Sequence, residues 1–209
     1  MDKCIIVGGV KINNAEMIKK YIRPDDFVIA CDSGIDNCGI LEITPNLIVG
    51  DFDSHEKPNT DVDIIVLPKE KDDTDTMYAA REAVKRGFNK VLLLGVIGER
   101  LDHSLANAHI LSYLNNEGIN GQIVDDYSEI SLLAENSVHI GRISDIFSYF
   151  SLISIDGRAE GVSIKNAKFP LNDGVITANH QYATSNEILP GEVAEVSIKK
   201  GKVLLIKVF

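Results

Sequence analysis

Four short clusters rich in aspartate contain the residue types that metal and phosphate chemistry uses. Each cluster follows a short apolar run, and in an open parallel sheet the carboxyl ends of the strands share one ligand-binding edge. We therefore expect the four clusters to lie together. They are Asp32-Ser33-Gly34, Gly50-Asp51-Phe52-Asp53-Ser54, Lys71-Asp72-Asp73-Thr74-Asp75, and residues 95–103 with Arg100, Asp102 and His103.

Several carboxylates at one edge would repel one another at a cost of several kcal/mol, or some would have to be protonated. A hard divalent cation removes this cost. Magnesium prefers carboxylate and phosphate oxygens, and no pair of His or Cys stands at zinc-ligand spacing. The sequence thus predicts a magnesium site that also receives a phosphate-bearing ligand, with four candidate ligands: Asp51, Asp53, Asp75 and Asp102.

Each of these residues also has a simpler interpretation. Asp75 and Asp102 both precede an amphipathic segment, so either could be a helix N-cap. The Asp-x-Asp pair alone is a weak signal that solvated loops also contain. His103 fits a helix start better than a metal ligand. Arg100 could be a surface charge, although an arginine between glycines and an aspartate suits the clamping of phosphate oxygens.

The residues before about position 125 alternate apolar runs with amphipathic stretches, which is typical of a parallel sheet covered by helices. The apolar runs lack polar alternation, as expected of strands buried on both faces. Expected strands are 4–7, 27–31, 47–49, 64–67, 91–94 and 122–124. Expected helices are 15–22, 76–86 and 105–115, with Gly87 and Gly118 as stops.

After residue 128 the helical period fades and segments rich in Thr, Ser, Val and Ile follow one another. Pairs of turn formers separate them at short intervals, which indicates an antiparallel β-sandwich or barrel. The expected segments are 147–155, 162–164, 175–177, 193–198 and 203–208, with turns at Asp156-Gly157, Asp173-Gly174 and Pro190-Gly191. The sequence therefore predicts an α/β domain at 1–125 and a β-sandwich at 126–209.

Composition narrows the possible partners and cellular location of the protein further. The net charge is -10, which argues against a nucleic-acid partner because such proteins concentrate positive charge. The three cysteines are expected to be reduced core residues. No signal sequence opens the chain and no apolar stretch reaches about 18 residues, so we expect a cytoplasmic protein without a membrane span.

Four blocks of the sequence, in order, resemble the thiamine pyrophosphokinase family. Residues 45–54 are similar to the family's "PDLIVGDFDS" and residues 71–75 to its "KDxTD". Residues 95–107 are similar to "GxxGGRLDHxLAN", and residues 185–187 to "SNE". Two positions depart from the pattern: Ser33 stands where Gly is common, and Glu99 replaces the second Gly of "GG".

The resemblance implies an N-terminal α/β domain that binds ATP and magnesium and a C-terminal β-sandwich that binds thiamine. It further implies a homodimer whose active sites lie between subunits. By motif position, Asp51, Asp75, Arg100 and Asp102 are the implied catalytic residues. The implied contacts with nucleotide, reacting centre or thiamine are Asp32, Ser33, Gly34, Lys71, Asp72, Thr74, His103, Ser185 and Asn186.

The implied reaction is attack by the hydroxyl of thiamine on the β-phosphorus of ATP, which gives thiamine diphosphate and AMP. Such transfer depends on positioning and on neutralising charge rather than on covalent help from the protein. Asp75 or Asp102 is a candidate proton acceptor, without a firm assignment. The chain has no Trp, and whether His180 or Tyr182 meets the pyrimidine of thiamine stays open.

Two other functions fit part of the pattern. A phosphatase of the haloacid dehalogenase type also uses Asp-x-Asp, but there the motif follows the first strand and ends in Thr or Val, whereas here it comes third and is followed by Ser54-His55. A nucleotide-sensing module would bind metal without chemistry. Inorganic phosphate as the product would identify the phosphatase, and the absence of any product would identify the sensor.

Overall fold

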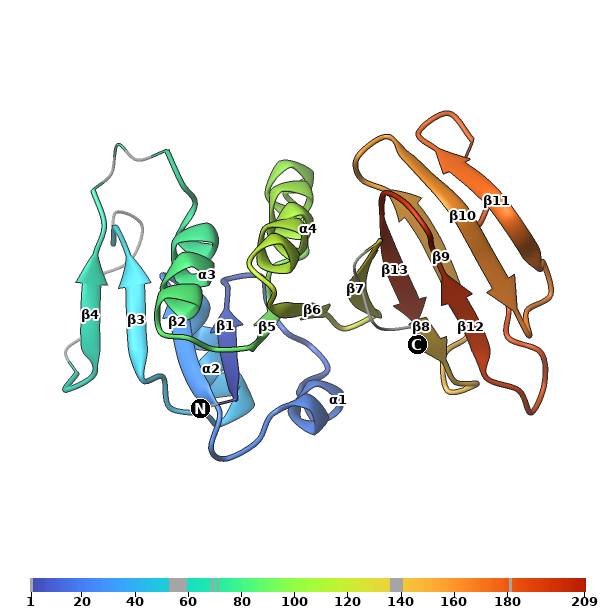
Figure 1. Ribbon diagram of the computed structural model, residues 1–209. Coiled ribbons are helices and arrows are strands. Elements are labelled where there is room, and N and C mark those ends of the chain that lie inside the picture. Colours follow the sequence, from blue (N-terminus) through green and yellow to red (C-terminus); the bar gives the residue numbers. More distant parts are fainter. Residues whose placement is uncertain (1, 53–59, 69, 71, 136–140, 181) are drawn as a thin grey trace. The chain divides into compact units, whose positions relative to one another are not determined.

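The computed structural model describes residues 2–52, 60–68, 70, 72–135, 141–180 and 182–209. The chain divides into two compact units, Met1–Asp126 and Tyr127–Phe209 (Figure 1). The predicted fold class is confirmed, because the first unit is a parallel sheet with flanking helices and the second is formed by strands.

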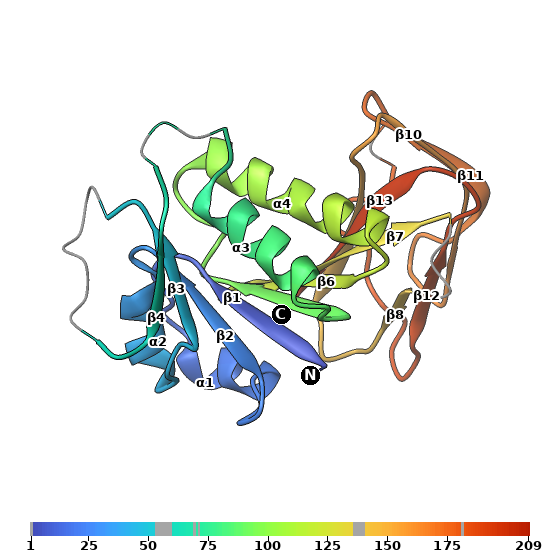
Figure 2. The same ribbon diagram turned by 60° about the vertical axis from the view of Figure 1, so that its left-hand side comes forward.

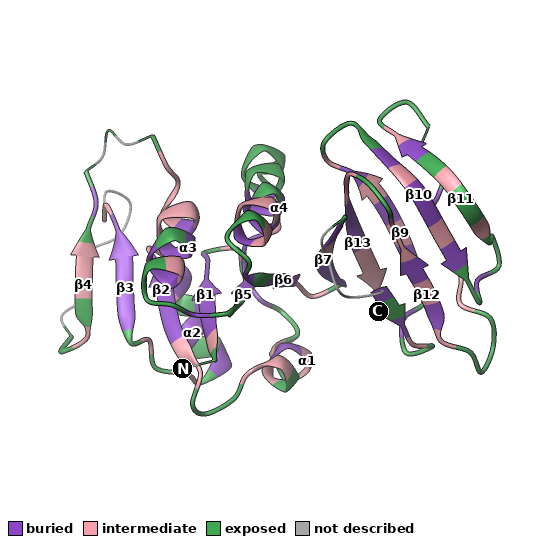
Figure 3. Cartoon of the chain, in the orientation of Figure 1, coloured by how far each residue is buried: buried purple, intermediate pink, exposed green. Residues whose placement is uncertain are grey.

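The first unit is built on parallel strands in the order β4-β3-β2-β1-β5-β6. Apart from Lys3 and Lys90 at their first positions, the central strands are apolar and have helices on both faces, so nearly all of their side chains are buried (Figure 3). The strands are β1 (Lys3–Val7), β2 (Phe27–Cys31), β3 (Leu47–Gly50), β4 (Asp63–Val66), β5 (Lys90–Leu94) and β6 (Asn120–Val124).

Helices cover both faces of this sheet. Figure 2 shows α3 and α4 side by side on one face, with α1 and α2 on the other. None of the described helices is long and apolar enough to cross a membrane. The helices are α1 (Ala15–Ile18), followed by the short 3-10 helix η1 (Lys19–Tyr21), then α2 (Gly34–Leu41), α3 (Asp75–Lys85) and α4 (Leu101–Asn116).

Both predicted glycine stops are confirmed. Gly87 and Gly118 have φ values of 79° and 73°, the left-handed region that glycine adopts without a steric penalty. The next residue donates its N–H back into the helix in each case, from Phe88 to the carbonyl of Ala83 at 3.2 Å and from Ile119 to the carbonyl of Leu114 at 2.8 Å. These bonds satisfy carbonyls that a helix end otherwise leaves without a donor.

Three expectations for this unit were wrong or incomplete. The helix expected at 15–22 ends as an α-helix at Ile18 and tightens into η1. The strand expected at 64–67 to be buried on both faces is the edge strand β4, which is half-exposed because no strand follows it on that side in the described chain. Helix α2 was not predicted, because a glycine and an asparagine occupy two of its buried positions.

The second unit is a sandwich of two antiparallel sheets, ordered β7-β13-β9 and β11-β10-β12-β8. Five of its strands overlap the predicted segments, whereas β7 and β8 were not predicted. The strands are β7 (Ser128–Ala134), β8 (Gly141–Ile143), β9 (Tyr149–Ser154), β10 (Arg158–Lys165), β11 (Leu171–Thr177), β12 (Ala194–Ser197) and β13 (Lys202–Val208).

One predicted turn in this unit was wrong. Asp173-Gly174 lies inside β11, where the register with β10 shifts on either side of Val162. Asp173 has a φ of 51°, and a residue in this conformation suits a β-bulge as well as it suits a turn. The sequence signal for a break in regular backbone was therefore correct, but the break bends a strand rather than ending it.

Phe150 is the largest fully buried side chain of the sandwich core. Phe150→Ala should lower the free energy of unfolding of this unit by about 3–5 kcal/mol, because the surrounding core cannot fill the cavity. Tyr149→Ala is the matched control, since Tyr149 is the neighbouring residue on β9 and is 45% exposed. Urea unfolding measures both, and equal losses would contradict this description of the core.

Candidate active site

The loops that follow β3, β2 and β1 are packed against one another at the carboxyl edge of the parallel sheet. A Cβ placed on Gly50 would lie 3.3 Å from the Cα of Asp32, and one placed on Gly9 would lie 1.9 Å from the Oγ of Ser33. The predicted cluster at residues 32–34 thus lies beside the cluster that begins at Gly50. A side chain at Gly9 would force the hydroxyl of Ser33 to move, because it would overlap Ser33 in its present position.

Two residues of these loops have left-handed backbone. Asp32 has a φ of 43° and Phe52 a φ of 51°. This region is uncommon for residues other than glycine, and the cost is greater for a bulky side chain such as Phe52. Strained backbone of this kind is concentrated at ligand sites, where the surrounding structure enforces it. Asp51, directly before Phe52, is half-buried.

Asp75 is not the N-cap of its helix. The cap of α3 is Thr74, whose Oγ1 accepts a hydrogen bond from the backbone N–H of Met77 at 3.2 Å. Asp75 is therefore the first residue of α3 and does not cap it. A negative charge there is stabilised by the dipole of α3. The dipole of α4 stabilises a negative charge on Asp102 in the same way, because Asp102 is the second residue of that helix.

Cys31, at the end of β2, is a buried thiol with carboxylates among its charged neighbours. Complete burial raises the pKa of this thiol well above its ordinary value, and the negative charges of Asp75 and Asp32 raise it further. Asp32 directly follows β2, and Asp75, which is 43 positions later in the chain, begins α3, which packs against β2 and β3.

Two predicted residues, Asp53 and Lys71, lie outside the described residues. Among the residues that are described, no group of three or more His, Cys, Asp or Glu side chains is arranged to hold a metal ion. The donors on Asp32, Asp51 and Asp75 are nevertheless all carboxylate oxygens, which suit magnesium and not zinc. The donor chemistry at this edge therefore fits a magnesium ion.

Arg100 and Asp102 form an ion pair at the start of α4. Nη2 of Arg100 lies 2.6 Å from Oδ2 of Asp102, and both side chains are about two-thirds exposed or more, at 71% and 66%. The hydrogen bond from Arg100, together with one from the backbone N–H of His103, lowers the pKa of Asp102 to about 2. Asp102 is therefore an ionised partner for Arg100 at neutral pH and a poor proton acceptor.

Side chains of α4 hold the loop between β5 and α4 in place by hydrogen bonds. Ser104 accepts a hydrogen bond from the backbone N–H of Gly98 at 2.9 Å and donates one to the carbonyl of Gly98 at 3.1 Å. Buried Asn107 donates to the carbonyl of Val96 at 2.8 Å. These bonds fix the backbone just before Arg100. Ser104 was not predicted, and Asn107 appeared only as a letter of the family motif.

The remaining predicted residues of this unit differ in exposure. Asp72 and His103 are exposed, Thr74 is half-buried as the cap described above, and Gly34 is buried. A Cβ on Gly34 would lie 2.0 Å from the carbonyl oxygen of Val7, so Gly34 allows α2 to start against the end of β1. Gly34 therefore contributes close backbone packing rather than a side-chain contact.

Ser185 and Asn186, in the second unit, differ sharply. Ser185 is exposed and has a left-handed φ of 54°. Asn186 is 1% exposed, and its side-chain amide is used internally. Its Oδ1 accepts from the N–H of Phe169 at 3.0 Å and of Glu187 at 2.9 Å, while its Nδ2 donates to the carbonyl of Phe169 at 2.8 Å. Asn186 holds this loop, and Ser185 is the residue that the loop presents.

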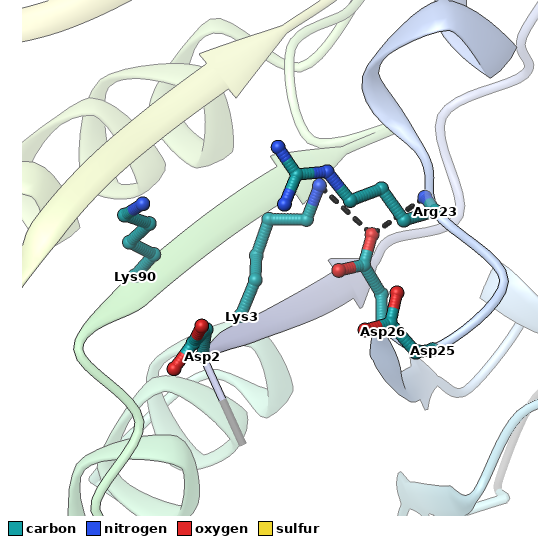
Figure 4. Close-up of a pocket in the computed structure, with 6 residues that line it drawn as sticks. All are labelled: Asp2, Lys3, Arg23, Asp25, Asp26 and Lys90. Carbon is teal, nitrogen blue, oxygen red and sulfur yellow. Dashed lines mark hydrogen bonds and ion pairs between the residues drawn. The ribbon is translucent and has the colours of Figure 1, made fainter.

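A small polar pocket lies at the opposite, amino edge of the parallel sheet (Figure 4). Its centre is occupied by an internal contact: Nζ of Lys3 lies 2.8 Å from Oδ2 of Asp26, and the same oxygen accepts from the N–H of Arg23 at 2.7 Å. Acidic and basic side chains line it in equal numbers, so it presents no net charge to a ligand. This pocket is a structural link rather than a second site.

A parallel α/β unit with carboxylates and an arginine at its carboxyl edge, followed by a β-sandwich, suits an enzyme that transfers phosphate groups. Family models agree with this class. Residues 18–123 match the thiamin pyrophosphokinase catalytic domain, and residues 135–203 match the thiamin pyrophosphokinase vitamin B1 binding domain. The chain therefore belongs to the thiamine pyrophosphokinase family, whose members are enzymes that make thiamine diphosphate.

Individual relatives support this assignment. The thiamine pyrophosphokinase of Bacillus subtilis is 25% identical over 209 residues, covering 97% of this chain and 96% of the relative. A crystal structure from the same species has a TM-score of 0.85 at 24% identity, covering 100% of this chain and 99% of that chain. Thiamin pyrophosphokinase from Candida albicans has a TM-score of 0.79 at 15% identity, covering 100% and 89%. The resemblance found in the sequence is confirmed.

The Arg100–Asp102 pair predicts a specific titration. The folded pKa of Asp102 lies below the ordinary value of about 3.9, so the carboxylate stays ionised until the pH falls through about 2. Carboxyl NMR should report that midpoint, and Arg100→Gln should return it toward the ordinary value. Arg81→Gln is the matched control, because Arg81 pairs with Asp73 instead. A midpoint near 4 in the unsubstituted protein would contradict the ion pair.

The contrast between Ser185 and Asn186 predicts opposite effects on stability. Asn186→Ala leaves the N–H groups of Phe169 and Glu187 without their acceptor, which should cost about 2–3 kcal/mol of unfolding free energy. Ser185→Ala should change that free energy by no more than about 0.5 kcal/mol, because its side chain is exposed. Chemical denaturation measures both values. A stable Asn186→Ala variant would show that the amide does not hold the loop.

Proposed function

We propose that this chain transfers a pyrophosphoryl group from ATP to the hydroxyl of thiamine and releases AMP. The observation that carries the proposal is that Asp32 lies beside the loop that begins at Gly50, with Asp75 at the start of the helix α3 that packs on the same strands, in a chain that matches both family domains. Carboxylates in these positions would supply oxygen donors to a magnesium complex of ATP.

The residues of the first unit would divide the work between binding and charge. Asp51 and Asp75, with Asp53 and Asp102, are the proposed magnesium ligands. Bound magnesium would neutralise charge on the phosphate oxygens. Arg100 would bind the oxygens of the transferred group, because a guanidinium presents several donors in a fixed plane. Its side chain is 71% exposed and already oriented by Asp102, so it has room to meet a ligand.

The proton of the attacking hydroxyl needs an acceptor. Asp102 is a weak candidate, because its pKa of about 2 leaves little affinity for a proton at neutral pH. Asp75 remains the better candidate of the two, although a carboxylate that also holds a metal is a poor base. Positioning and charge neutralisation would then supply most of the rate enhancement, as is usual for phosphoryl transfer.

The second unit would supply the contacts with thiamine. Ser185 is exposed on a loop whose shape Asn186 maintains, so a direct contact is proposed for Ser185 and a supporting role for Asn186. Lys71, Asp72, Thr74 and His103 are proposed to lie around the phosphates. A homodimer with active sites between subunits, located in the cytoplasm, follows from the family resemblance and is proposed with it.

Asp75→Asn tests the assignment. The substitution keeps the shape of the side chain and leaves the Thr74 cap intact, so the melting temperature should hardly change. Turnover should fall by about 100-fold or more, because a charge at the reacting phosphates is lost. Asp73→Asn is the matched control: Asp73 is two residues away and forms an ion pair with Arg81 at 2.8 Å on the exposed side of the helix start.

Product analysis separates the proposed reaction from its alternatives. Incubation with ATP, thiamine and magnesium should give AMP and thiamine diphosphate in equal amounts, and no turnover should occur when magnesium is removed by a chelator. Inorganic phosphate as the product would indicate a phosphatase instead. Unchanged turnover and magnesium dependence in Asp75→Asn would show that Asp75 has been given the wrong role.

A further inference from the structure

The point between β1 and β5 is where the strand order of the parallel sheet reverses. The chain places β2, β3 and β4 on one side of β1, and β5 and β6 on the other. Loops that leave adjacent strands in opposite directions open a crevice at such a point, and ligands of open α/β sheets bind there. The loop that follows β1, residues 8–14, forms one wall of this position.

Asn37 reaches this loop from α2, which lies on the face of the sheet opposite to α3 and α4 (Figure 2). The residue is only 2% exposed. Its Nδ2 donates to the carbonyls of Gly8 at 2.7 Å and of Val10 at 2.8 Å, and its Oδ1 accepts from the N–H of Ile12 at 3.2 Å. One amide therefore ties three points of a loop that is 25–29 positions distant in the chain. Both of its donor hydrogens are used for this purpose.

The same side chain also lies against the loop after β5. A Cβ placed on Gly95 would lie 2.6 Å from the carbonyl oxygen of Gly8 and 2.8 Å from Nδ2 of Asn37. Backbone bonds join the two loops directly, from the N–H of Gly8 to the carbonyl of Leu94 and from the N–H of Val10 to the carbonyl of Gly95, at 2.8 and 2.9 Å. Asn37 thus fixes the junction of both loops at the strand-order reversal.

The far end of the loop is held separately by Asp126. Its carboxylate accepts from the N–H of Asn13 and of Asn14, the latter at 2.8 Å. Between the two anchors, Gly9 is exposed, and among the described residues no hydrogen bond involves its N–H. The loop therefore presents the backbone of Gly9 at the carboxyl edge. The N–H groups of residues 8, 10, 12, 13 and 14 are hydrogen-bonded within the protein.

We propose that Asn37 is a positioning residue for the nucleotide: it holds the loops after β1 and β5 in the shape that receives the phosphate chain. This proposal rests on the proposed function, because it assigns the nucleotide to that same edge. Asn37 would act without touching the ligand, by keeping the Gly8–Val10 backbone close against Gly95. Without the amide, the loop would have to be ordered by the nucleotide at the expense of affinity.

Two substitutions at Asn37 and one control test this role. Asn37→Ala removes all three bonds. Asn37→Asp keeps the acceptor for Ile12 but turns a carboxylate oxygen toward the carbonyls of Gly8 and Val10. Asn46→Ala is the control, because Asn46 makes a similar bond to the backbone N–H of Val28, at 2.8 Å, at the amino edge of the same sheet.

The measurements separate nucleotide binding from catalysis and from folding. The Kd for a fluorescent ATP analogue should rise by about tenfold in both Asn37 variants and by less than about twofold in Asn46→Ala, per molecule folded. In turnover assays the KM for ATP should rise in the same proportion, while the KM for thiamine stays within about twofold. If the Asn37 variants do not fold, Asp126→Asn loosens the same loop from its exposed end and should raise the Kd by about threefold.

Unchanged nucleotide affinity in a folded Asn37 variant would overturn the proposal, as would equal rises in the two KM values. If Asp126→Asn is used, an unchanged Kd overturns it in the same way. A protein that makes no thiamine diphosphate, yet loses nucleotide binding through Asn37, would refute the proposed reaction and support the positioning role. A protein that makes thiamine diphosphate with Asn37 replaced and an unchanged Kd would do the reverse.

Discussion

Direct backbone contact between neighbouring loops is the constraint on which the carboxyl edge depends. Parallel strands bring their ends together, but side chains would normally keep the following loops several ångströms apart. Gly9, Gly34 and Gly95 remove that spacing, because each lies where a Cβ would overlap a neighbouring atom. Gly50 also allows close approach between the ends of β3 and β2, since a Cβ placed there would lie 3.3 Å from the Cα of Asp32, and the aspartates that follow these two strands therefore lie on adjacent loops.

Neutral side chains hold most of this edge, and Asp126, which accepts from the N–H groups of Asn13 and Asn14, is a charged exception. Asn37, Asn107 and Ser104 each hold a loop by hydrogen bonds to its main chain, and Asn186 does the same in the second unit. A buried amide that is fully hydrogen-bonded adds no charge near the carboxylates and satisfies backbone groups that would otherwise be costly to bury. For this reason, removal of an amide should mainly affect the stability or shape of a loop, whereas removal of a carboxylate should mainly affect turnover.

Local patterns predicted most of the strands but less of the site. Apolar runs without alternation identified the strands of the first unit, since burial on both faces leaves that signal in the sequence. The edge strand β4 has the same apolar letters, so its exposure was not visible. The acidic clusters were found because each follows a strand. Thr74 as the cap was not, because Thr74 and Asp75 are both common N-cap residues.

The role of Asn37 illustrates what the sequence alone does not contain. Its partners lie in a loop that precedes it by a whole strand, and nothing in the local letters distinguishes it from an ordinary helical asparagine. The left-handed residues Asp32, Phe52 and Ser185 are similar, because none is a glycine that would mark the conformation. Long-range hydrogen bonds and left-handed backbone of this kind become visible only in the three-dimensional structure.

The anchoring of residues 8–14 should affect substitutions in this loop differently from insertions and deletions. Asn37 and Asp126 grip main-chain atoms, so Val10 and Lys11 can be exchanged for other residues without loosening either grip. An insertion or deletion is different, because it would move Gly9 away from Ser33 and put a residue with a side chain in its place. The side chains at positions 10 and 11 should therefore vary during evolution, whereas Gly8, Gly9 and the length of the loop should hardly change.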